Sequence, residues 1–139
     1  MIVFDENVHQ QQIMASVAAW YRGRVLSITA LRPGTLIADE AIPAILRRAS
    51  QPTFVTTNVE DFWRRVPAHP RYGIMCNVLP SERLQELPLF VRRLFRMSAL
   101  TTKARRMGKV VRASMHQFQY YDVHSRSIRS LYPWPDPLR

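Results

Sequence analysis

Three pairs of neighbouring acidic residues stand where apolar or periodic segments of the chain begin or end. The pairs are Asp5/Glu6, Asp39/Glu40 and Glu60/Asp61. Carboxylate oxygens are the ligands that hard divalent cations take, and Mg²⁺ typically uses one or two carboxylates together with water and substrate phosphate. Two such ions can clamp the attacking and leaving oxygens of a phosphodiester. If the fold gathers the three pairs, they could form a metal site for phosphodiester hydrolysis.

The first pair follows the stretch "IVFDEN", residues 2–7. The apolar run at 2–4 is typical of a parallel strand that is buried on both faces. Asp5, Glu6 and Asn7 would then lie where this strand leaves the sheet, and ligands bind at that edge in open α/β sheets. The alternative is structural, because Asp5 or Asn7 could simply cap the helix that follows.

Strands and helices alternate along the first 97 residues. Strands are predicted at residues 2–4, 24–31, 53–57 and 73–80, and helices at 8–21, 39–49 and 81–97. Ser81 is expected to cap the last helix, and Pro88 should kink or divide it. This order predicts an α/β fold, a three-layer α/β/α arrangement with a mainly parallel central sheet. Right-handed crossovers would bring the ends of the first and third strands to one edge.

The remaining residues depart from this alternation. Residues 98–108 are polar and basic and are predicted to form a loop, while 109–121 and 123–132 are predicted as two strands of a hairpin that turns near residues 122–125. The segment "YPWPDP", 132–137, is too rich in proline to be regular. We therefore expect an α/β domain over 1–97 and a basic C-terminal extension, 98–139, packed on the same domain.

Charge is distributed unevenly along the sequence. Up to Phe62, five arginines face six acids, for a net charge of −1, whereas from Trp63 onward fifteen Lys and Arg face four acids, for +11. An acidic pocket beside a basic surface is what a metal-dependent nuclease needs, since the metal requires anionic ligands and the phosphate backbone requires cations. The alternative is the solvated basic surface of an ordinary protein.

Two groups of basic residues are candidates for binding nucleic acid. They are Arg92, Arg93 and Arg96 in the predicted last helix, and Lys103, Arg105, Arg106, Lys109 and Arg112 in the extension. The second group precedes Phe118, Tyr120 and Tyr121, whose rings could stack on unpaired bases. The arginines of the helix could equally line a solvent-exposed face, and the aromatic rings could instead pack on the core.

Other residue patterns narrow the class of protein. The one cysteine, Cys76, allows no internal disulfide, and the chain shows neither a signal peptide nor an apolar segment of the roughly 18 residues that span a bilayer. A cytoplasmic protein is expected. The four histidines are scattered without the spacing of a zinc site, and Ser81 lacks the glycines of a nucleophile elbow.

Four motifs in this order resemble a known family. They are "FDEN" after the first strand, "LIADEAIPAILRRA", "FVTTNVEDFW", and "GIMCNVLP" followed by a helix. Together they are similar to the PIN-like family of predicted toxin nucleases, relatives of the VapC-type PIN ribonucleases and of the Mut7-C domain. The resemblance covers residues 2–97 and implies a compact α/β fold with a Mg²⁺ or Mn²⁺ site.

The resemblance also assigns residues to that site. It implies that Asp5 and one carboxylate of the Asp39/Glu40 pair hold the metal, and that Asp61 belongs to the acidic cluster after the third strand. The family usually carries an aspartate shortly after the threonine, and here Asn58 stands at one alignment of that position while Glu60 or Asp61 stands at others. An amide oxygen can bind a hard ion but adds no charge, which would weaken the metal site.

These observations lead to one main functional hypothesis. We expect a metal-dependent endoribonuclease in which Asp5, Asp39 and Asp61 are the metal ligands and catalytic residues, with Glu6, Glu40 and Glu60 as alternative ligands or their partners. By resemblance, the context is the toxin of a toxin–antitoxin pair, inhibited by a cognate protein and able to form a homodimer. The alternatives are a non-catalytic RNA-binding module and a protein–protein adaptor whose positive charge is incidental.

Overall fold

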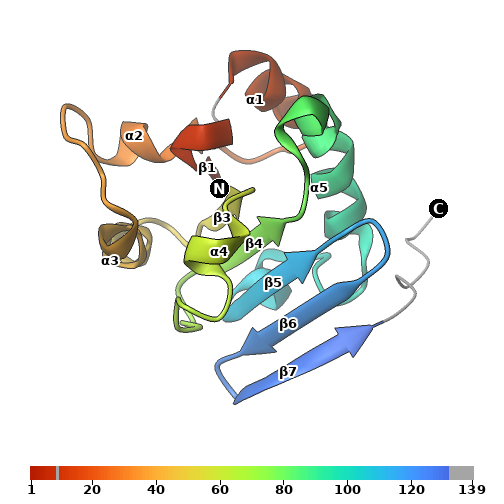
Figure 1. The fold of residues 1–139 in the computed structure, drawn as a ribbon. Coiled ribbons are helices and arrows are strands. Elements are labelled where there is room, and N and C mark those ends of the chain that lie inside the picture. The colour runs from red at the N-terminus through yellow and green to blue at the C-terminus, as the bar shows by residue number, and fades with distance from the viewer. Residues whose placement is uncertain (9, 132–139) are drawn as a thin grey trace.

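The computed structural model of the chain describes residues 1–8 and 10–131. These residues form one seven-stranded sheet in the order β2-β1-β3-β4-β5-β6-β7 (Figure 1). The strands are β1 (Ile2–Phe4), β2 (Val25–Ser27), β3 (Thr53–Thr56), β4 (Gly73–Asn77), β5 (Lys109–Ala113), β6 (Phe118–Asp122) and β7 (Ser125–Leu131). Pairing is parallel from β2 to β5 and antiparallel from β5 to β7. The predicted α/β class with a mainly parallel sheet is therefore confirmed.

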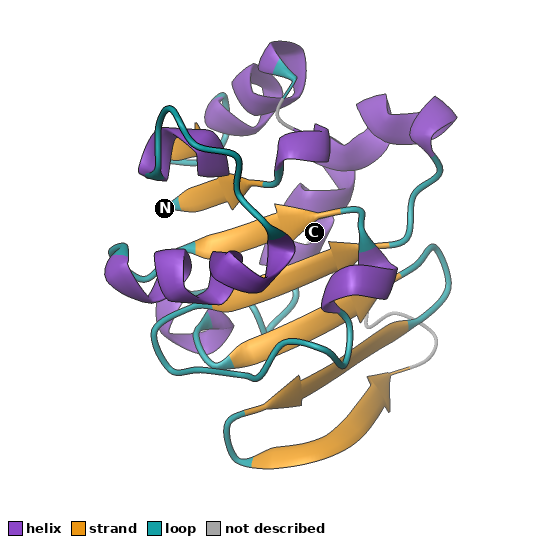
Figure 2. Ribbon diagram, turned by 60° about the vertical axis from the view of Figure 1, so that its left-hand side comes forward, coloured by secondary structure: helices purple, strands orange, loops and turns teal. Residues whose placement is uncertain are grey.

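Helices cover both sides of this sheet (Figures 1 and 2). The α-helices are α1 (Gln11–Ala18), α2 (Ile28–Leu31), α3 (Ile42–Arg48), α4 (Val59–Phe62), α5 (Leu87–Arg96) and α6 (Lys103–Arg106). Three 3₁₀ segments precede α1, α3 and α5, namely η1 (Glu6–Val8), η2 (Asp39–Ala41) and η3 (Ser81–Glu86). The predicted helix at 39–49 is thus present as η2 and α3, and the predicted helix at 8–21 is shorter than expected.

Each face of the sheet has its own hydrophobic core. On the side that we call the α5 face, residues of α1 and α5 such as Val17 and Leu94 pack on Phe4 and Val55. On the other side, the α4 face, residues of α3 and α4 pack on residues such as Val3 and Phe54. Successive strand residues point to opposite faces. Strand β1 is therefore a continuous apolar run, and all four residues of β3, two of them threonines, are buried.

Local chemistry explains where the predicted elements are interrupted. The predicted strand at 24–31 ends after Ser27, because the Ser27 hydroxyl accepts a hydrogen bond from the Thr29 N–H and begins α2. Pro88 divides the predicted helix at 81–97 as expected, since it lies in the first turn of α5, where no N–H is needed. Ser81 does not cap that helix, because it lies inside η3, whose N-cap is Pro80.

The C-terminal segment contains one more strand than predicted. Residues 114–117 interrupt the predicted strand at 109–121 and separate β5 from β6, while the predicted turn between Asp122 and Ser125 is confirmed. The predicted loop at 98–108 contains the short helix α6, capped by the Thr102 side chain. Strand β5 pairs with β4, so the sheet runs on without a break past residue 97. The predicted irregular segment 132–137 lies outside the described residues.

Strand order fixes the position at which a ligand could bind. From β1 the chain crosses to β2 on one side, and it later enters β3 on the other side of β1. In such open parallel sheets the reversal leaves a crevice at the carboxyl ends of the two strands between which it occurs, here β1 and β3. None of the helices within residues 1–8 and 10–131 is long and apolar enough to cross a membrane.

Candidate functional site

Asp5 occupies the crevice at the end of β1. Its backbone N–H donates to the Val55 carbonyl oxygen at 3.0 Å, so the pairing with β3 continues one residue beyond the strand. Its side chain is buried, and Oδ2 accepts a hydrogen bond of 2.7 Å from the hydroxyl of Thr56, the last residue of β3. Its Oδ1 accepts from the Glu6 N–H, also at 2.7 Å. The structure thus fixes a buried carboxylate between the carboxyl ends of β1 and β3.

A hydrogen-bonded chain connects Asp5 to the third acidic pair. The Thr56 hydroxyl that donates to Asp5 also accepts from the Asn58 N–H at 2.9 Å. The Asn58 side chain in turn donates through Nδ2 to Oδ2 of Asp61 at 2.7 Å. Asn58 precedes α4 but does not cap it with its side chain. The amide instead orients the Asp61 carboxylate, one helical turn further along.

Asp39 completes the cluster from the start of η2. Its pKa is raised above the ordinary value of 3.8, first by burial, then by a side-chain hydrogen bond with Asp61, and further by the negative charges of Asp5, Asp61 and Glu40. Every one of these effects favours the protonated acid. One member of each acidic pair, Asp5, Asp39 and Asp61, therefore belongs to a single electrostatically coupled group, which we call the acidic cluster.

The other predicted acidic residues lie around this cluster. Glu6 is half-buried and contributes its backbone N–H to Asp5. Glu40 and Glu60 are exposed, and Glu40 acts on Asp39 through its charge. Asn7, the alternative cap of the first helix, instead donates to the Thr57 hydroxyl at 3.3 Å, and α1 begins at Gln11 with no side-chain cap. Asp5 caps the short segment η1 through the Glu6 N–H, and neither Asp5 nor Asn7 caps α1.

The donor chemistry of the acidic cluster fits Mg²⁺ or Mn²⁺. Its side chains offer carboxylate and amide oxygens, and the pKa of Asp39 is raised by burial and also by neighbouring negative charge that a divalent cation would neutralise. Across residues 1–8 and 10–131, however, no three His, Cys, Asp or Glu side chains are close enough together to form a metal-binding group. The acidic cluster is thus a loose assembly of suitable ligands and not a preformed coordination shell.

Asn77 is a residue at this edge that the sequence analysis missed. It ends β4 and is fully buried, and its Nδ2 donates to the carbonyl oxygens of Thr56 and Met75, both at 3.1 Å. Its Oδ1 has no hydrogen-bond partner among the described residues. Asn77 holds the end of β3, which carries the Thr56–Asp5 contact. The signal in the sequence was an amide that ends the otherwise apolar run "GIMC".

A row of side chains runs across the α4 face from Asp5 towards the C-terminal strands. The strand register places Thr56 beside Cys76 and Cys76 beside Arg112, which pairs with Gln119. Burial raises the pKa of Cys76 to about 12, while the Arg112 charge lowers it and the Asp5 charge raises it. The Arg112 guanidinium donates to Gln119 Oε1 at 3.3 Å. Arg112 is therefore the predicted basic residue that shares a face with Asp5.

The other predicted basic residues lie elsewhere. Arg92 and Arg96 are exposed and Arg93 is half-buried on α5, which covers the opposite face of the sheet from Asp5. Lys103 and Arg105 are exposed at α6, and Lys109 is half-buried at the start of β5. The structure does not bring these six side chains together with the acidic cluster.

Arg106 corrects the sequence analysis. Its side chain is buried, with the guanidinium 4.1 Å from the centre of the Phe95 ring and Nη1 donating to the Leu100 carbonyl oxygen at 3.0 Å. Burial lowers the pKa of this arginine. Arg106 is thus a buried structural residue whose guanidinium is engaged by Phe95 and the Leu100 carbonyl.

The aromatic residues of the extension are also largely structural. Phe118 and Tyr121 are buried in the two cores, and Tyr120 is half-buried beside Arg129. The alternative interpretation, in which these rings pack on the core, is confirmed for Phe118 and Tyr121.

Comparison of the chain with protein-family models, with curated proteins and with solved structures finds no match.

Proposed function

We propose that this protein is a metal-dependent endoribonuclease that hydrolyses phosphodiester bonds at the acidic cluster. The observation that carries the proposal is the coupling of Asp5, Asp39 and Asp61, which come from three separate acidic pairs, at the carboxyl edge between β1 and β3. Burial, a side-chain hydrogen bond with Asp61 and the neighbouring acids together raise the pKa of Asp39.

Each residue of the cluster has a distinct role in this proposal. Asp5, Asp39 and Asp61 would hold Mg²⁺ or Mn²⁺, with Asn58 as a neutral oxygen ligand. When bound, such an ion lowers the pKa of a coordinated water and neutralises charge on the scissile phosphate. Thr56 orients the Asp5 carboxylate, and Asn58 orients Asp61. Arg112 supplies a positive charge on the same face, where the phosphate backbone of the substrate would pass.

The family resemblance supplies the biological context of the proposal. The motifs around Asp5, Asp39 and Asp61 are similar to those of PIN-like toxin nucleases, so we propose an RNA-cleaving toxin of the cytoplasm with a cognate inhibitory protein. The same resemblance suggests a homodimer.

Cleavage of end-labelled single-stranded RNA tests the proposal directly. We expect cutting with Mn²⁺ and none with chelator, and we expect Asp5→Asn to lower the rate at least about a hundredfold, because it removes a charged ligand. The matched control is Glu82→Gln, which removes an exposed acid of η3 outside the cluster. Equal rates for Asp5→Asn and the parent protein, with both folded by circular dichroism, would contradict the proposal.

A second candidate function is an RNA-binding module without catalysis. Two observations favour it: Asn58 brings no charge to the site, and the described carboxylates do not form a ready metal-binding group. This candidate predicts that RNA binds equally well with Mn²⁺ and with chelator. It also predicts that neither the parent protein nor Asp5→Asn cuts the RNA.

A further inference from the structure

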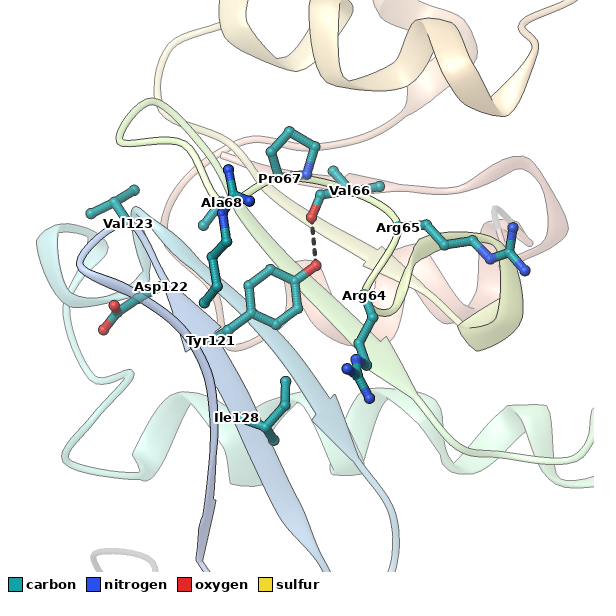
Figure 3. Close-up of a pocket in the computed structure, with 10 residues that line it drawn as sticks. Arg64, Arg65, Val66, Pro67, Ala68, Tyr121, Asp122, Val123 and Ile128 are labelled. Atoms are coloured by element: carbon teal, nitrogen blue, oxygen red, sulfur yellow. Dashed lines mark hydrogen bonds between the residues drawn. The ribbon is translucent and has the colours of Figure 1, made fainter.

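A pocket of about 520 Å³ opens on the α4 face, between residues 64–68 and the turn that joins β6 to β7 (Figure 3). Tyr121, which lines it, belongs to the same core cluster as Val3 and Cys76. The pocket therefore opens on the face of the sheet towards which Asp5 points. Its volume lies within the range of about 300–1,000 Å³ that small-ligand sites occupy.

The charge of this pocket is positive. Arg64, Arg65 and Arg126 line it, and the Arg65 side chain extends away from Tyr121 and Ile128 (Figure 3). Within residues 1–8 and 10–131, the guanidinium groups of Arg64 and Arg126 form no hydrogen bond or ion pair. The acid of the pocket, Asp122, is already neutralised, because Oδ2 pairs with Arg129 at 3.2 Å and Oδ1 accepts two backbone N–H groups. Two guanidinium groups thus remain available for an anion.

The floor of the pocket is apolar and held in place. The Tyr121 ring lies 5.2 Å from the Trp63 ring, and its hydroxyl donates to the Val66 carbonyl oxygen, as Figure 3 shows. Val123, with 43% of its surface exposed, and the half-buried Ile128 complete the floor. A ligand could thus place an anionic group at the arginines and an apolar or aromatic group on these side chains.

Backbone strain at Arg64 is an independent observation. Arg64 has a φ of 63°, in the left-handed region that non-glycine residues rarely adopt. Such strain persists where the surrounding structure enforces it, and it is concentrated at functional sites. Here the bond from Tyr121 to Val66, two residues along, fixes the loop in the conformation that presents Arg64 beside the apolar floor.

We propose that this pocket binds one nucleotide of single-stranded RNA, with its phosphate at Arg64 and Arg126 and its nucleoside on Val123 and Ile128. The inference deepens the proposed function, on which it rests for the identity of the polymer. Asp61 of the acidic cluster and Arg64 are three residues apart, so their Cα atoms are at most about 11 Å apart. One RNA strand can therefore contact both sites, and the pocket would set the position of the cut.

RNA binding in the presence of chelator tests the pocket without cleavage. We measure the anisotropy of labelled single-stranded RNA with the full chain and the variants Arg64→Gln and Arg126→Gln. Each should lose about tenfold in affinity and reduce the slope of log K against log salt by about 0.7. The matched control is Arg96→Gln, because Arg96 is exposed on α5, on the opposite face of the sheet from the pocket. Equal losses for Arg64→Gln and Arg96→Gln would overturn the proposal.

Small competitors then identify the ligand chemistry. Uridine monophosphate should displace the RNA at lower concentration than uridine or inorganic phosphate, and should shift the methyl NMR signals of Val123 and Ile128. An acidic peptide that competes better than the nucleotide would overturn the proposal in favour of a protein partner. Because the binding assay contains chelator and measures no cleavage, a failure of the pocket and a failure of cleavage are separately visible.

Discussion

The hydrogen bond between Thr56 and Asp5 can be tested by replacing Thr56 with valine. Valine has nearly the shape of threonine but lacks the hydroxyl, so Thr56→Val removes the 2.7 Å bond to the Asp5 carboxylate without creating a cavity. It also removes the acceptor of the Asn58 N–H. The substitution therefore breaks the chain that links β1 to Asp61 while leaving the packing of β3 intact.

The size of the effect follows from burial and charge. Thr56 is fully buried, so water cannot replace its hydroxyl at Asp5. A hydrogen bond to a charged group contributes about 1.5–3 kcal/mol to stability. The Asn58 N–H loses its acceptor in this variant, but it is only partly buried and can donate to water instead. We expect Thr56→Val to lower the free energy of unfolding by about 2–3 kcal/mol, and Thr56→Ser, which keeps the hydroxyl, to lower it by less.

Urea denaturation followed by circular dichroism measures this difference. Thr53→Val is the matched control, because Thr53 is a buried residue of the same strand and its hydroxyl bonds to no described residue. The control reports the gain from the added methyl group alone. If Thr56→Val and Thr53→Val change the unfolding free energy equally, the Thr56–Asp5 bond does not stabilise the site, and the reasoning about this edge of the sheet is refuted.

Three further results are expected. Because the pKa of Asp39 in the folded protein is raised above 3.8, ionisation of Asp39 lowers the stability as pH rises through that pKa. Asp39→Asn should therefore stabilise the protein more at pH 7 than at pH 3, as measured by urea denaturation. The opposite order would contradict the electrostatic coupling of Asp39 to the acidic cluster. Gln51 and Arg64 both have a positive φ, and replacing either by glycine should relieve about 0.5–1 kcal/mol of backbone strain and raise the thermal unfolding midpoint. Only Arg64→Gly should also weaken RNA binding. Unchanged midpoints would argue against backbone strain at these positions. Burial raises the pKa of Cys76 to about 12, so a thiol reagent at pH 8 should label it only in denaturant, whereas rapid labelling of the native protein would show that β4 is accessible.

Much of the sheet could be predicted from local sequence, because β1 and most of β4 are apolar, β3 is rich in β-branched residues, and all three strands are buried on both faces. Interruptions that depend on one side chain were harder to predict. The second half of the strand predicted at 24–31 forms α2 because Ser27 caps a helix there. The helix start near Pro88 could be predicted, because proline is tolerated in a helix only within the first turn.

The candidate site was predicted in its residue types but not in its connections. The acidic pairs are visible in the sequence, and their places after β1 and β3 follow from the strand order. The bond from Thr56 to Asp5 and the amide of Asn58 on Asp61 depend on rotamers and register that no local pattern encodes. The burial of Arg106 against Phe95 was equally invisible, since an arginine in a basic segment normally faces water.

The sequence by itself determined the class of fold, the edge at which the acidic residues gather and the basic character of the C-terminal half. These properties follow from the order of apolar segments and from charge, which are local quantities. Only the tertiary structure determined which basic side chains lie on the same face of the sheet as the acidic cluster. Strand pairing carries Arg112 to the α4 face, and the hairpin of β6 and β7 folds against residues 64–68 to create the pocket. Contacts between residues far apart in sequence arise only when the sheet is assembled, because register and crossover direction set them.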